Sequence, residues 1–117
     1  MRKELENRLI KLALDINRNC KKLDNSFLSK HLTSQIIRSS TSSALNYGEA
    51  QAAESRKDFI HKVSLVLKEL RETKICIILL SDNFKPKLSN NQLLEECDQL
   101  IAIFHKTIVS AKKNRSK

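Results

Sequence analysis

The fold of this chain is decided by residues 35–50, QIIRSSTSSALNYGEA. The middle of this stretch carries small and hydroxyl side chains where a helix normally carries large apolar ones. Because Ser and Thr are mediocre helix formers, a helix built on them depends on tertiary packing. Small side chains also let a second backbone approach closely. We therefore expect a helix that serves as a packing surface, with contacts at Ser39, Ser42 and Ser43.

The composition around this stretch favours helices throughout. One Gly, one Pro, four Phe and one Tyr are too few for a β architecture, which needs turn, aromatic and β-branched residues in quantity. A length of 117 residues suits a single domain, residues 1–117. We predict an all-α, antiparallel up-down four-helix bundle with helices at about 3–23, 27–50, 56–82 and 90–112.

The helix limits follow from apolar spacing and capping residues. Apolar side chains at steps of three and four form the first stripe, through Leu5, Leu9, Leu12, Ile16, Cys20 and Leu23. Asp24, Asn25 and Ser26 offer N-cap residues for the second helix. Ser55 and Ser89 are candidate caps of the third and fourth helices, and Pro86 indicates a loop before the fourth. Gly48 weakens the second helix by about 1 kcal/mol, so a break there stays open.

Residues 75–80, ICIILL, are apolar on every side of a helix. A helix with one solvent face does not tolerate such a run, and every helix of a small bundle keeps a solvent face. We expect a neighbouring subunit to cover the second side, with Ile77 and Ile78 as packing residues.

The net charge of +9 favours an acidic partner such as RNA or DNA, and the alternative is a merely soluble basic protein. On the first helix, cations recur at helical spacing beside the apolar stripe and form a candidate phosphate-binding edge: Arg8, Lys11, Arg18 and Lys22. Asp15 interrupts this edge. It offers a second interpretation, a solvated face in which Asp15 pairs with Lys11 and Arg18.

No pattern of catalytic or metal-binding residues emerges. A single Gly excludes a glycine-rich phosphate loop, and the three histidines lack the spacing of a metal site. The serines have no His or Lys at the spacing of a general base. We therefore expect no enzyme activity, no metal and no cofactor. Arg38, Asn46 and Glu49 lie near whole helical turns of one another, which indicates a structural polar network or, alternatively, a ligand contact.

The cysteines and the hydropathy indicate the cellular compartment of the protein. Cys20, Cys76 and Cys97 are widely spaced in apolar helical contexts, which is typical of core thiols in a reducing cytoplasm. Charged residues follow Met1, and the longest apolar run, residues 75–80, is too short to span a bilayer, so secretion and membrane insertion are both disfavoured. We expect a cytoplasmic protein without a membrane partner.

Several segments together resemble the four helix bundle protein family: residues 37–42, IRSSTS, then Asn46, then 49–55, EAQAAES, 58–62, DFIHK, and 67–73, LKELRET. This bacterial family includes proteins encoded in intervening sequences of large-subunit ribosomal RNA genes. The accessory variability proteins of diversity-generating retroelements are similar in fold. The resemblance implies an up-down bundle assembled as a homopentameric ring. For the retroelement branch it implies binding of nucleic acid and of a reverse transcriptase.

This chain departs from its relatives at two places. Many of them carry an apolar residue, Gly and Ala where this chain has Ser43, Ala44 and Leu45, and many carry an aromatic residue near Cys76. The first departure affects how closely another helix can approach this stretch, and the second affects side-chain packing in the third helix.

Two functions follow as hypotheses. The first is a non-enzymatic oligomeric binding module whose basic helix faces contact phosphates. The alternative is a scaffold that docks a partner such as a reverse transcriptase without binding nucleic acid itself. The sequence does not choose between the two branches of the family.

Overall fold

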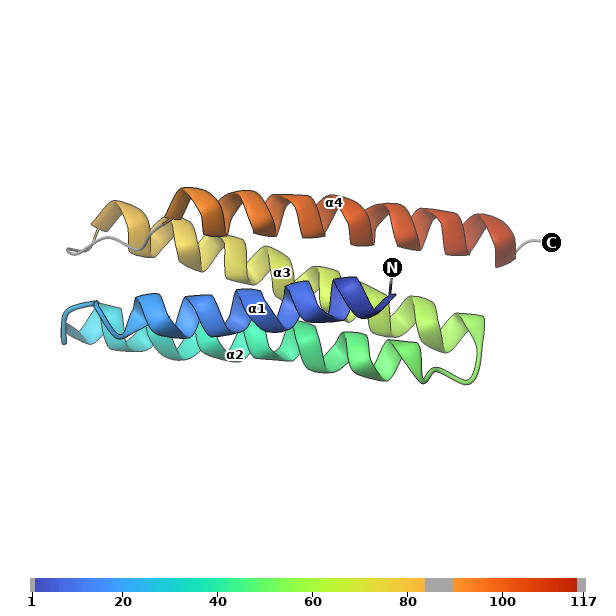
Figure 1. The fold of residues 1–117 in the computed structure, drawn as a ribbon, viewed down its shortest axis with the longest axis horizontal. Helices are drawn as coiled ribbons and strands as arrows, with labels where there is room; N and C mark the ends of the chain where they lie inside the picture. Colours follow the sequence, from blue (N-terminus) through green and yellow to red (C-terminus); the bar gives the residue numbers. More distant parts are fainter. Residues whose placement is uncertain (1, 84–89, 116–117) are drawn as a thin grey trace.

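The computed structural model describes residues 2–83 and 90–115, which form four helices and no strand. They are α1, Arg2–Cys20; α2, Phe27–Gln51; α3, Arg56–Asn83; and α4, Asn90–Arg115. Successive helices run in opposite directions, each packs on the next, and α1 also touches α4 (Figure 1). The all-α class and the up-down order agree with the prediction.

The limits of α1 and α4 differ from the expected ones. α1 ends at Cys20, three residues before 23, because the N–H groups of Lys22 and Leu23 bond to carbonyls only three residues back. Leu23 still packs against the core, so the apolar spacing continues beyond the end of the helix. α4 continues to Arg115 instead of ending near 112.

The N-terminal caps of α2 and α3 form as expected. The Ser26 hydroxyl accepts a hydrogen bond from the Ser29 N–H at 3.2 Å, and the Ser55 hydroxyl accepts one from the Asp58 N–H at 3.0 Å. α2 continues through Gly48 without a break and ends at Gln51. The expected cap at Ser89 and the loop at Pro86 lie outside the described residues.

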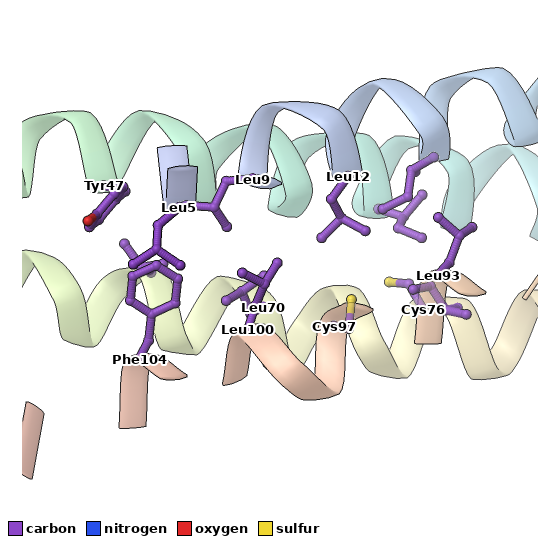
Figure 2. Packing of buried hydrophobic residues seen from close by; sticks show 14 of the residues in the cluster. Leu5, Leu9, Leu12, Tyr47, Leu70, Cys76, Leu93, Cys97, Leu100 and Phe104 are labelled. Carbon is purple, nitrogen blue, oxygen red and sulfur yellow. The ribbon is translucent and has the colours of Figure 1, made fainter. Parts of the chain in front are cut away.

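All four helices contribute to one apolar core. The expected stripe of α1 is buried from Leu5 to Cys20 and faces side chains of α3 and α4, including Leu70 and Leu100 (Figure 2). The rings of Tyr47 and Phe104 meet edge to face, with centroids 5.1 Å apart. Among the described residues, no helix has the length and hydropathy to cross a membrane.

The second half of α3 is apolar on both its buried and its outer side. Ile77 is fully buried, whereas Ile78 and Ile75 keep 39% and 59% of their surface exposed. The core of one chain therefore accommodates Ile77 and leaves Ile75 and Ile78 facing outward. Within this chain Ile78 is not a core residue.

Candidate nucleic-acid interface

A groove of about 540 Å³ separates α1 from the first half of α4. It exists because these two helices touch only sparsely, while α2 packs along the length of α1. Its lining combines basic, amide and apolar side chains with two carboxylates: Lys11, Leu12, Asp15, Arg18, Asn19, Lys22, Gln92, Leu93 and Glu96. The groove thus brings together Lys11, Arg18 and Lys22 of the predicted phosphate-binding edge. We call these three residues the α1 cation edge.

Arg8, the remaining member of the predicted edge, bridges α1 to α4. Its Nε and Nη2 donate to the two carboxylate oxygens of Glu96 at 3.0 and 2.6 Å, and Nη2 also donates to Gln99 Oε1 at 3.0 Å. The hydrogen bonds that Arg8 donates to the Glu96 carboxylate raise the pKa of Arg8 above its ordinary value. Arg8 is therefore engaged inside the protein, and a phosphate at this position would have to displace Glu96.

Asp15 is shared by two members of the α1 cation edge. Lys11 Nζ lies 2.6 Å from Asp15 Oδ2, and Arg18 Nη1 lies 2.8 Å from Asp15 Oδ1. These are the local pairs of the second interpretation. Both cations remain largely exposed, at 75% and 66% of their side-chain surface. Lys22 lies in the turn after α1 and forms no ion pair with any described carboxylate.

The charge of the groove follows from these pairings. Lys11 and Arg18 share Asp15, Lys22 adds a third positive charge, and Glu96 is already paired with Arg8. The groove therefore carries a positive excess, with side-chain amides at Asn19 and Gln92 beside it. Sequence reasoning missed the role of Glu96. The acidic start of α4 was visible, but its contact with Arg8 spans 88 positions of the chain.

The polar residues Arg38, Asn46 and Glu49 do not form one network. Arg38 pairs with Glu69 and Glu72 of α3, Asn46 Nδ2 donates to the Ser42 carbonyl at 2.9 Å, and Glu49 lies 3.5 Å from Lys62. Eight residues of helix span about 12 Å, which is too far for Arg38 to reach Asn46. The expectation of a shared network is corrected: Arg38 and Glu49 reach across to α3, whereas Asn46 bonds within α2.

A buried hydroxyl chain joins α2 to α3 beside Arg38. Ser39 Oγ and Thr73 Oγ1 are 2.7 Å apart, and Thr73 Oγ1 donates to the Glu69 carbonyl at 2.9 Å. Since each hydroxyl has one proton, the short contacts fit a chain from Ser39 to Thr73 to the carbonyl. Ser39, Ser40 and Ser43 are fully buried, while Ser42 is half-buried. Ser40 was not among the expected packing residues.

The thiols are buried, and burial raises the pKa of Cys97 to about 12. Neighbouring Asp98 and Glu96 add to that rise. Among the described residues, no group of three His, Cys, Asp or Glu side chains is placed to hold a metal ion.

Comparison with known proteins places the chain. No curated protein matches it. A solved structure of a protein of unknown function from the S23 ribosomal protein family of Bacteroides thetaiotaomicron VPI-5482 is 27% identical to it. That match covers 89% of this chain and 97% of the other, with a TM-score of 0.79. The family model described as 23S rRNA-intervening sequence protein matches residues 4–106. The chain therefore belongs to the 23S rRNA-intervening sequence protein family.

Proposed function

We propose that this protein is a non-enzymatic, oligomeric nucleic-acid-binding protein that contacts phosphates through the α1 cation edge. The observation that carries the proposal is the groove in which Lys11 and Arg18 share the carboxylate of Asp15 and Lys22 adds a third positive charge. A nucleic-acid phosphate placed there would meet more positive than negative charge. The net charge of +9 would favour the approach of a polyanion from a distance.

The pairs that Asp15 makes do not oppose this role strongly. Exposed ion pairs within one helix contribute only about 0.3 to 0.5 kcal/mol, because water screens them and the side chains lose freedom. Lys11 and Arg18 are exposed enough to swing toward a phosphate without leaving a buried charge behind. Arg8 is different, since its contacts to Glu96 are half-buried and charge-assisted at two positions. We therefore omit Arg8 from the proposed phosphate contacts.

The oligomer is part of the proposal. Ile75 and Ile78 leave an apolar strip on the outer side of α3, and a second copy of the chain would remove that strip from water. We take the homopentameric ring implied by the family resemblance as the expected assembly. A ring repeats the α1 cation edge, and repetition raises the affinity of weak contacts through effective concentration.

Mobility shifts with structured RNA and with duplex DNA at about 50 mM and about 200 mM salt would test the proposal. We expect retardation that weakens steeply with salt, since each phosphate contact adds about 0.9 to the slope of log affinity against log salt. The variant K11Q/R18Q/K22Q should lower that slope by about 2 to 3.

The matched control is K3Q/K30Q/K57Q, which removes the same charge from exposed positions outside the groove. This control should keep most of the slope. Absence of retardation at low salt, or an equal loss in both variants, would contradict the proposed function.

A further inference from the structure

A second groove lies between α3 and the second half of α4. It encloses about 510 Å³ and combines cations with apolar side chains: Ser64, Leu67, Lys68, Arg71, His105, Ile108, Val109 and Lys112. Its α4 residues follow those of the α1/α4 groove along the helix, so the two sites do not overlap. Its volume falls in the range of small-molecule binding clefts, roughly 300 to 1,000 Å³.

The cations of this groove are not neutralised by any carboxylate in the described part of the chain. No carboxylate is found among the described lining residues. Lys68, Arg71 and Lys112 form no ion pair with any carboxylate in the described part of the chain, and the nearby Glu72 is already paired with Arg38. The α1/α4 groove differs, because Asp15 and Glu96 line it. The α3/α4 groove is therefore the more positive of the two.

The groove also has an apolar side. Leu67 and Ile108 contribute to its lining, and Val109, which lines it together with His105, keeps 44% of its surface exposed. An anion such as phosphate gains nothing from Ile108 or Val109. A ligand that uses the whole groove must therefore carry a negative group and a flat or apolar group close together.

We propose that the α3/α4 groove binds a nucleotide of an unpaired nucleic-acid strand. The phosphate lies against Lys68, Arg71 and Lys112, and the base lies against Val109, Ile108 and the His105 ring. A duplex keeps its bases stacked inside and would offer the apolar side no partner, whereas an unpaired strand exposes base faces. This inference rests on the proposed function, nucleic-acid binding, and adds a preference for single strands at a separate site.

Fluorescence anisotropy with the full chain would test the preference. The probes are a labelled single strand of about 12 nucleotides and the duplex of the same sequence, at one low salt concentration. We expect the single strand to bind more tightly. The exposed-site variant V109S should weaken single-strand binding by about fivefold or more and leave duplex binding unchanged. K68Q/R71Q should weaken single-strand binding by more than about tenfold.

Two controls separate the effect of positive charge in general from binding of a nucleotide in this groove. K30Q/K57Q removes the same charge as K68Q/R71Q outside both grooves and should leave the single-strand preference intact. Polyglutamate, a competitor with charge and no bases, should displace the strand much less effectively than unlabelled single strand does.

The outcomes distinguish the two proposals. Equal binding of both probes with no effect of V109S, or displacement by polyglutamate as efficient as by single strand, would overturn this inference. In both cases the proposal that the α1 cation edge contacts phosphates would be unaffected. If the wild-type chain binds neither probe at low salt, the inference and the proposed function fail together.

Discussion

At the scale of single residues, three serine side chains in the middle of α2 act as packing groups. Ser39, Ser40 and Ser43 are fully buried, and Ser43 Oγ donates to the Ser40 carbonyl at 2.7 Å. Each hydroxyl is thus satisfied within its own helix or by Thr73. Because these hydroxyls already have hydrogen-bond partners, only the small volume of the serine side chains limits how closely α3 approaches α2.

Replacing Ser43 by Leu should therefore overpack the bundle interior. We expect a loss of roughly 1 to 3 kcal/mol in the free energy of unfolding, measured by urea denaturation. Ser34→Leu, at an exposed position of the same helix, should change it by less than about 0.5 kcal/mol. Equal stabilities for the two variants would show that volume at Ser43 is not limiting.

Cys97 makes stability depend on pH in the alkaline range. Burial, aided by Asp98 and Glu96, raises the pKa of its thiol from 9.0 to about 12. Between these values the unfolded chain has lost the proton that the folded chain keeps. The contribution of Cys97 to stability is therefore complete below about pH 9 and is lost as the pH rises toward 12.

Comparing wild type with Cys97→Ala isolates this contribution. Denaturant titrations between about pH 8 and about pH 11 should show stability falling less steeply with pH in the variant. Other alkaline groups titrate in both proteins and cancel in the difference. Parallel pH profiles would contradict the assigned cause.

At the scale of helices, the local sequence was sufficient to predict which face of a helix is buried. It was insufficient to predict which side chains on other helices pair with its charged residues. The spacing of Leu5, Leu9 and Leu12 identified the inner face of α1, because helical periodicity is a local property. The partner of Arg8 lies on another helix, 88 positions away, and only the tertiary arrangement reveals it. For the same reason the partners of Arg38 on α3 were not foreseen.

The bridge from Arg8 to Glu96 should hold α1 against α4. Arg8→Gln removes two charge-assisted hydrogen bonds at a half-buried position, and we expect unfolding to become easier by about 1 kcal/mol after allowance for solvent screening. Native-state hydrogen exchange should quicken mainly in α1. Arg18→Gln removes an equal charge from the same helix and should have a smaller effect. Equal effects of the two substitutions would argue against the bridge.

At the scale of the whole molecule, the outer side of α3 bears on assembly. Light scattering of the wild-type chain in dilute buffer should give a mass of several chains. I75S/I78S should lower that mass to one chain, because these side chains expose 59% and 39% of their surface in isolation. Leu45→Ser, at a site 68% exposed on α2, serves as the control and should keep the assembly. A wild-type mass of one chain would contradict the proposed oligomer.

The hydrogen bond between Ser39 and Thr73 also favours one alignment of α2 and α3 along their length. Sliding α3 along α2 by one turn, about 5.4 Å, would separate the two hydroxyls, although each keeps a carbonyl acceptor in its own helix, Ile36 for Ser39 and Glu69 for Thr73. The shift would therefore lose one hydrogen bond between the helices, worth about 0.5 to 1.5 kcal/mol, whereas a purely leucine-lined contact would accept several offsets at similar energy. The Ser39–Thr73 pair thus favours the observed alignment of α2 and α3 over shifted ones.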